Sequence, residues 1–97
     1  MLKYELSSRA QVDIENIWTY TFENWSRDQA NKYFDFIQSE VILICRYPES
    51  QRALKLSTRS IGIRRAKSQL IIFNIKNNKV FVIRILHKSM DLEKHLS

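Results

Sequence analysis

Few side chains in this sequence could do acid–base, nucleophilic or metal chemistry. The chain has two histidines, His87 and His95, and a single cysteine, Cys45. A neutral imidazole can act as a general base near neutral pH, but these histidines have no metal-ligand spacing and no third ligand beside them. We therefore expect no catalytic residue, no metal and no cofactor. His87 is expected in a structural or partner-contacting role and His95 in solvent.

Cys45 falls on the apolar side of a predicted helix, where no histidine or cation stands at helical spacing from it. We expect a core thiol rather than a nucleophile, because a reactive cysteine needs a neighbour that stabilises its thiolate. A lone cysteine excludes an intrachain disulfide and suits a reducing compartment such as the cytoplasm. The helix carboxylates Asp13, Glu15 and Glu23 are expected on a solvated face, although Asp13 could instead pair with a cation of the sheet or the tail.

The cations are more informative than the acids. Arg64, Arg65 and Lys67 fall on one predicted strand, where alternation places Arg65 and Lys67 on one face and Arg64 on the other. Guanidinium groups offer a planar fork of donors for phosphate or carboxylate. The candidate target- or partner-binding residues are therefore Arg64, Arg65, Lys67, Arg84, His87 and Lys88.

Arg84 is the most unusual of these cations, because the other residues over 80–86 are apolar. A cation in such a strand must be paired or must reach solvent. One interpretation places Arg84 on the target-facing surface. The other pairs it with Asp91 or Asp13, so that it fixes the tail or a helix.

The net charge of +6 over 97 residues is unevenly distributed. Residues 1–45 hold four basic and seven acidic side chains, a net −3, whereas residues 46–97 hold twelve and three, a net +9. The basic half is expected either to meet an anionic partner, a nucleic acid or an acidic protein, or to form a solvated basic face. The single glycine excludes a phosphate-cradling loop, and no apolar run approaches the ~18 residues of a membrane span. The length suits one domain, residues 1–97.

Hydrophobic periodicity predicts the elements that carry these residues. Residues 2–6 alternate apolar and polar side chains, as a half-buried strand does. Apolar residues at three- and four-residue steps predict a helix that begins with a capping box at Ser8 and ends near Asn24. A second helix begins with another capping box at Ser26 and must stop before Pro48. With almost no linker between them, the two helices should form an antiparallel hairpin.

The second half of the chain changes to β-type sequence. Residues 49–61 show little periodicity and are predicted to be a loop, and 63–67 a strand. The β-branched and aromatic runs 70–73 and 80–83 predict a hairpin that turns at Asn77–Asn78. The order β-α-α-β-β-β predicts an α+β domain. It has an N-terminal strand, an antiparallel helical hairpin, a mainly antiparallel three-stranded sheet and a short C-terminal tail.

Several segments at these spacings resemble the ParE branch of the RelE/ParE toxin superfamily, over nearly the whole chain. The first helix matches in Leu6-Ser7-x-x-Ala10-x-x-Asp13-Ile14-x-x-Ile17-Trp18-x-Tyr20 and the second in Trp25-Ser26-x-x-Gln29-Ala30-x-x-Tyr33. Later matches are Pro48, Gly62-Ile63-Arg64-Arg65, Ile71-Ile72-Phe73 and Arg84-Ile85-Leu86-His87-x-x-Met90-Asp91. The last of these is the most specific segment.

The resemblance implies the toxin of a type II toxin–antitoxin system, which inhibits DNA gyrase and hence replication. It implies neutralisation by a ParD-like antitoxin in a cytoplasmic hetero-oligomer that contacts DNA only indirectly, through the antitoxin. Two alternatives stay open: a ribosome-dependent mRNA interferase of the RelE type, and an inactive antitoxin-binding module. The RNase branch carries a tyrosine late in the chain, whereas all four tyrosines here precede Pro48, which favours gyrase.

Overall fold

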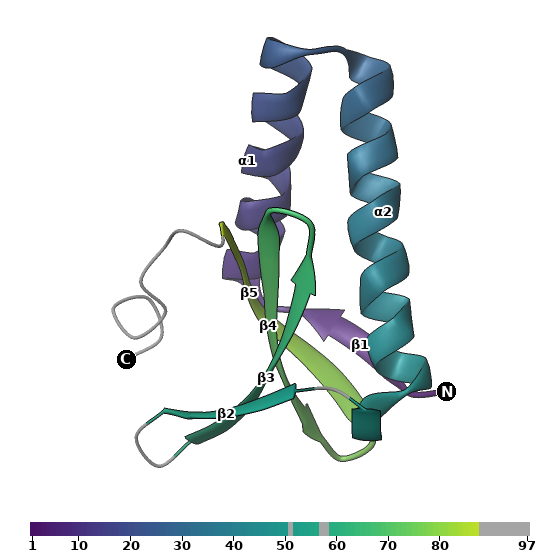
Figure 1. Cartoon of the computed structure of the whole chain (residues 1–97), viewed down its shortest axis with the longest axis vertical. Coiled ribbons are helices and arrows are strands. Elements are labelled where there is room, and N and C mark those ends of the chain that lie inside the picture. Colours follow the sequence, from purple (N-terminus) through teal and green to yellow (C-terminus); the bar gives the residue numbers. More distant parts are fainter. Residues whose placement is uncertain (51, 57–58, 88–97) are drawn as a thin grey trace.

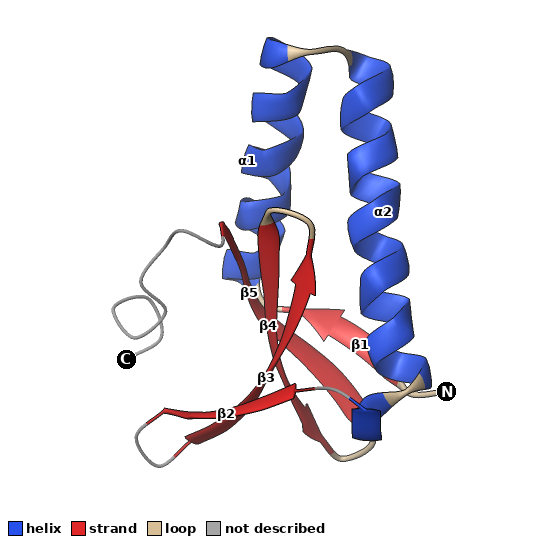
Figure 2. Cartoon of the chain, viewed as in Figure 1, coloured by secondary structure: helices blue, strands red, loops and turns tan. Residues whose placement is uncertain are grey.

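The computed structural model describes residues 1–50, 52–56 and 59–87, with side chains for residues 1–50 and 61–87. A helical hairpin lies against one face of a five-stranded sheet (Figures 1 and 2). The elements are β1 (Lys3–Leu6), α1 (Ser8–Asn24), α2 (Arg27–Arg46), the 3-10 turn η1 (Pro48–Ser50), β2 (Arg52–Leu56), β3 (Arg59–Ala66), β4 (Gln69–Lys76) and β5 (Lys79–His87). The α+β class and the helical hairpin are confirmed, and the predicted C-terminal tail lies outside the described residues beyond His87.

The strands of the sheet follow the order β1-β5-β4-β3-β2. β1 pairs with β5 in parallel, and the other neighbours pair antiparallel. The prediction of a loop over 49–61 is wrong for Arg52–Leu56, which is an edge strand, and for the first residues of β3. An edge strand this short and this basic has little β propensity of its own, so pairing with β3 decides its structure.

The helix starts follow the predicted chemistry with one shift. Ser7, not Ser8, caps α1: its Oγ accepts from the Ala10 amide at 3.0 Å. Ser26 caps α2 as predicted, and α2 ends at Arg46, before the proline. Ser7 Oγ also donates to the Ile83 carbonyl of β5 at 2.6 Å, so the sheet selects which of two adjacent serines becomes the cap.

Two tight turns rest on residues with positive φ. Asn77 (φ 54°) and Asn78 (φ 58°) form the β4–β5 turn, as the sequence predicts. Lys67 (φ 57°) lies in the β3–β4 turn, so the prediction that it shares a strand face with Arg65 is wrong. Its ammonium lies 4.4 Å from the centre of the Phe36 ring in α2, and this contact ties the turn to the helix.

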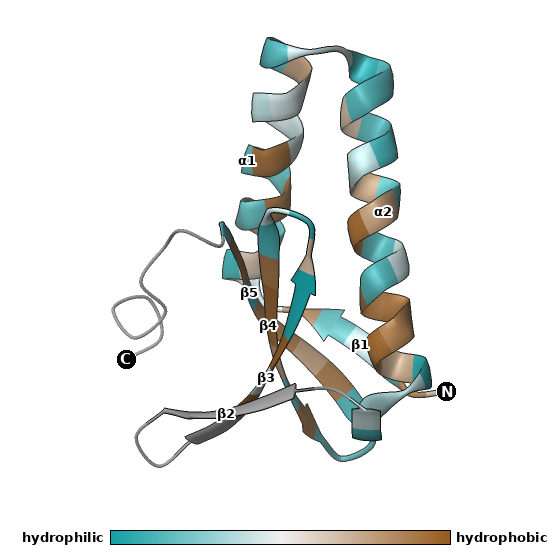
Figure 3. Cartoon of the chain, in the orientation of Figure 1, coloured by the Kyte–Doolittle hydropathy of each residue, from teal (hydrophilic) through white to brown (hydrophobic). Residues whose placement is uncertain are grey.

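The main core lies between the helical hairpin and the sheet. In α2 its apolar residues gather in the C-terminal half, beside the strands (Figure 3). The buried residues of this core are Ala10, Ile37, Val41, Ile44, Cys45, Ala66, Ile71, Phe73, Val80, Val82 and Ile85. Gly62 faces the Phe73 ring so closely that an added Cβ would overlap it. A smaller cluster of Ile61, Ile72 and Leu86 lies on the opposite face of the sheet.

Candidate partner-binding cleft

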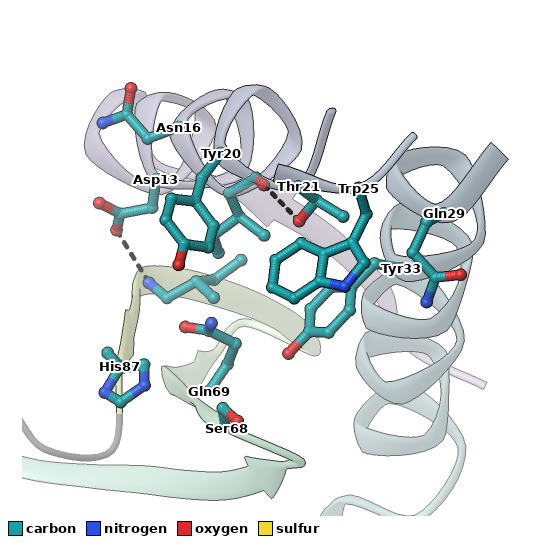
Figure 4. Close-up of a pocket in the computed structure, with 12 residues that line it drawn as sticks. Asp13, Asn16, Tyr20, Thr21, Trp25, Gln29, Tyr33, Ser68, Gln69 and His87 are labelled. Carbon is teal, nitrogen blue, oxygen red and sulfur yellow. Dashed lines mark hydrogen bonds between the residues drawn. The ribbon is translucent and has the colours of Figure 1, made fainter. Parts of the chain in front are cut away.

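A cleft of about 770 Å³ opens where α1, α2 and the ends of β4 and β5 meet (Figure 4). Its α1 side is a single helix stripe, because residues three, four and seven positions apart share one face of a helix. The lining residues are Asp13, Asn16, Ile17, Tyr20, Thr21, Trp25, Gln29, Tyr33, Ser68, Gln69, Ile85 and His87. The cleft therefore combines an apolar floor with polar side chains at its rim.

Three aromatic rings dominate one wall of the cleft. Tyr20 and Trp25 are 61% and 66% exposed, and their ring centres lie 6.0 Å apart. Tyr33, from the second turn of α2, faces the same space (Figure 4). Large exposed aromatic side chains grouped around a hollow are typical of a surface that a partner covers.

In the sequence, Trp25 and Tyr33 belong to the apolar stripes of the two helices, and Tyr20 has no predicted function. The sequence signal for a binding site was the aromatic pair Tyr20 and Trp25, next to the α1–α2 connection. This turn extends beyond the sheet, so the sheet does not cover it (Figure 1). Aromatic side chains in such a place are candidates for a binding site.

Asp13 closes the other end of the cleft with a network of three hydrogen bonds. Its carboxylate accepts from Arg84 Nε at 2.8 Å, from a terminal guanidinium nitrogen of Arg84 at 3.0 Å, and from the Ile85 amide at 2.9 Å. The hydrogen bond to Asp13 raises the pKa of Arg84 above its ordinary value. The expectation that Asp13 lies on a solvated face is wrong, and its alternative, an ion pair with a sheet cation, is confirmed.

The sequence-predicted cations do not form one site. Arg64 pairs with Glu40 of α2, with a guanidinium nitrogen 2.8 Å from the carboxylate, and Arg84 pairs with Asp13. Arg65 is exposed and lies opposite Leu70, on the sheet face that points away from the helices. Lys88 lies outside the described residues.

His87 is exposed at the end of β5, where its ring lines the rim of the cleft. It pairs in register with Gln69, so these two side chains flank the opening together. His87 and Lys67 therefore lie on the helix side of the sheet and Arg65 on the other. Two guanidinium groups of the predicted set serve ion pairs that fix the helices.

Cys45 is buried near the end of α2, and burial raises the pKa of its thiol above the ordinary value. The prediction of a core thiol is confirmed. Over residues 1–50 and 61–87, no group of three or more His, Cys, Asp or Glu side chains could hold a metal ion. No described helix is long and apolar enough to span a bilayer.

Solved structures of two toxin–antitoxin systems share this fold. A chain of "Chromosomal ParDE TA system from P. aeruginosa" superimposes with a TM-score of 0.77 at 13% identity, over 90% of this chain and 96% of that one. A chain of the toxin–antitoxin complex RelBE2 from Mycobacterium tuberculosis gives a TM-score of 0.68 at 11% identity, over 90% and 98%. At these identities the likeness concerns the fold alone.

Sequence similarity narrows this class to one family. The chain belongs to the family described as ParE toxin of type II toxin-antitoxin system, parDE, whose model matches residues 4–92. It is 34% identical to Toxin ParE1 of Caulobacter vibrioides, over 99% of both chains. It is also 28% identical to Toxin ParE1 of Mycobacterium tuberculosis, over 97% of both. The predicted resemblance to ParE toxins is confirmed.

Proposed function

We propose that this protein is the toxin of a ParD–ParE pair that inhibits DNA gyrase in the cytoplasm and is held inactive in a hetero-oligomer with a ParD-like antitoxin. The observation that carries the proposal is the match to the ParE family over residues 4–92. A protein inhibitor of gyrase needs no catalytic residue, which suits the thin catalytic inventory of the chain.

We propose that the cleft is the binding site for a flexible segment of the antitoxin. Tyr20, Trp25 and Tyr33 offer apolar area for a side chain of the partner, and the amides of Gln29 and Gln69 offer polar contacts at the rim. The charge of Asp13 is already neutralised by Arg84, so this acid does not repel an acidic segment. A segment that folds into the cleft would bury the exposed aromatic wall.

The target surface we propose includes Lys67 and His87, which are exposed on the helix side of the sheet, at the β3–β4 turn and the end of β5. It extends round this end of the sheet to Arg65, which is exposed on the opposite face. Arg64 and Arg84 support this end of the molecule through their ion pairs with α2 and α1. Lys88 follows His87 directly in the chain and completes the set in sequence.

The test adds the purified chain to a gyrase supercoiling assay and to a cell-free translation assay, each with and without the antitoxin. We expect supercoiling to stop, translation to continue, and the antitoxin to restore supercoiling. Loss of translation with intact supercoiling would instead assign an mRNA interferase of the RelE type. Loss of neither, with antitoxin binding retained, would assign an inactive antitoxin-binding module.

A matched pair of variants tests whether the antitoxin binds in the cleft. Trp25→Ala removes the most exposed ring of the cleft, whereas Phe34→Ala removes a 40% exposed ring of α2 that does not line it. We expect Trp25→Ala to weaken antitoxin binding about tenfold or more, as loss of an aromatic anchor does, and Phe34→Ala to leave binding unchanged. Equal affinities for the two variants would place the antitoxin elsewhere.

A further inference from the structure

A row of three lysines crosses three adjacent strands at the end of the sheet opposite the cleft. Lys3 of β1 is the register partner of Lys79 in β5, and Lys79 is the register partner of Lys76 in β4. Directly paired residues share a face of a sheet. Tyr4, which alternates with Lys3, points to α2, where its hydroxyl accepts from Gln38. The three lysines therefore lie on the face away from the helices.

The row of lysines does not stabilise the sheet. Like charges in directly opposed positions destabilise a sheet. Glu5 lies 3.5 Å from Lys79, with 60% and 39% of the two side chains exposed, so it screens the row weakly. The three lysines and Glu5 together keep a net charge of +2 within one small area. An unfavourable arrangement of this kind is expected where the charge serves a binding partner.

The dimensions and composition of the row fit a phosphate backbone. Neighbouring strands lie ~4.8 Å apart, so three paired positions span roughly 10 Å. One strand of duplex DNA carries a phosphate about every 3.4 Å of helix axis, so a row of this length faces about three phosphates. Between Lys76 and Lys79, the exposed amides of Asn77 and Asn78 form the tip of the turn and can donate to phosphate oxygens.

The same features argue against an acidic protein as the partner. Stable protein interfaces centre on buried aromatic or aliphatic anchors. Phe81, the ring that the Lys79 ammonium contacts at 5.7 Å from its centre, is itself half-buried and offers little exposed apolar area. The β4–β5 turn itself consists of charged and amide side chains (Figure 3).

We propose that the row Lys3–Lys79–Lys76, with the Asn77–Asn78 turn, binds the phosphate backbone of duplex DNA without reading its sequence. The toxin then contacts DNA directly, in addition to any contact made through an antitoxin. The proposal does not depend on gyrase as the target, because it rests on charge and register in the sheet.

The test measures binding of the full chain, free of antitoxin, to fluorescent duplexes of about 20 base pairs and unrelated sequence, between about 50 mM and 200 mM salt. If the three lysines neutralise three phosphates, affinity should fall about 40-fold over this range. The variant Lys76→Gln/Lys79→Gln keeps one contact, so its affinity should fall only about three- to fourfold. A matched double variant, Arg9→Gln/Lys32→Gln, removes two exposed cations from the helices and should keep the wild-type salt dependence.

Both double variants should melt within a few degrees of the wild-type protein, because all four changed side chains lie at the surface or half-exposed. If both double variants lost DNA affinity and salt dependence equally, net charge alone would explain the binding, and the proposal would be overturned. So would the absence of duplex binding at low salt. Binding of polyglutamate that is as tight as binding of DNA, and equally sensitive to the two lysines, would assign the row to an acidic protein and also overturn it.

Discussion

Truncation of the Asp13–Arg84 ion pair should destabilise the protein asymmetrically. Arg84→Ala removes two hydrogen bonds but leaves Asp13 bound to the Ile85 amide. Asp13→Ala removes the same two bonds and also leaves both the Arg84 guanidinium and the Ile85 amide without this acceptor. The side chains are 12% and 16% exposed, close to the buried limit, where loss of one partner costs 3–5 kcal/mol. We expect about 3 kcal/mol for Arg84→Ala, the low end of this range, because Asp13 keeps its bond to the Ile85 amide. For Asp13→Ala we expect about 4–5 kcal/mol, since an unsatisfied amide adds roughly 1–2 kcal/mol.

Double-mutant cycles on three ion pairs of the chain provide the measurement. Glu40–Arg64, at 15% and 26% exposure, is intermediate in burial, and Glu5–Lys79, at 60% and 39%, is the exposed control. Urea unfolding of each cycle should give coupling energies of about 2 kcal/mol for Asp13–Arg84, about 1 for Glu40–Arg64, and below about 0.5 for Glu5–Lys79.

A coupling of Asp13 to Arg84 no larger than that of Glu5 to Lys79 would contradict the expected effect of burial. An equal loss of unfolding free energy in Arg84→Ala and Asp13→Ala would also contradict it, because the bond to the Ile85 amide would then contribute nothing. An unchanged dependence of the free energy on urea is the required control, since a change would mean that a variant alters the unfolded state.

Two further predictions concern the core. Gly62→Ala should destabilise the protein by about 2 kcal/mol in thermal melting, because the new Cβ overlaps the Phe73 ring, and Phe73→Leu in the same chain should recover part of this loss; an unchanged melting temperature would contradict the packing. Because burial raises the pKa of Cys45, its thiol should react slowly with a disulfide reagent in the native state and quickly in urea. Stability should also fall as the pH rises through the ordinary pKa of cysteine, because the thiol of the unfolded chain ionises first. Fast labelling of Cys45 in the native state would contradict its burial.

The helices were predictable because their signals are local. The apolar stripe, the cap at Ser26 and the stop before Pro48 lie within a few residues of one another, as does the Asn77–Asn78 turn. The strand Arg52–Leu56 was missed because its evidence is non-local: its structure comes from pairing with β3. The choice between Ser7 and Ser8 was equally open, since both precede the helix and only contact with β5 separates them.

The site was predictable in its residue types but not in its arrangement. The sequence indicated that Arg84 must be paired or exposed, and Asp13 was one of its possible partners. These residues are 71 positions apart, however, and no local pattern selects between Asp13 and a carboxylate of the tail. The cleft was missed because its wall combines residues from both helices with the ends of β4 and β5.

Along the edge of β5 beyond β1, the start of α1 takes the place that a neighbouring strand would occupy. β1 pairs with β5 as far as Leu6 and Val82, and then the chain leaves the sheet. From there Ser7 binds the carbonyls of Val82 and Ile83, at 2.9 Å through its amide and 2.6 Å through its hydroxyl. In the second turn of the helix, the Asp13 carboxylate accepts from the amide of Ile85 at 2.9 Å. The edge of β5 is thus covered by helix side chains instead of a strand.

This substitution is also what builds the cleft. A strand beside the end of β5 would fill the space, whereas a helix that touches the edge at Ser7 and Asp13 rises away from the sheet beyond these contacts (Figure 1). Tyr20 lies two turns beyond Asp13 on the same helix stripe, so its ring is held over the gap that results. The ion pair with Arg84 fixes the angle of α1 at the point where the helix leaves β5. Stability and the shape of the binding surface therefore depend on the same carboxylate, and a change at Asp13 should affect both.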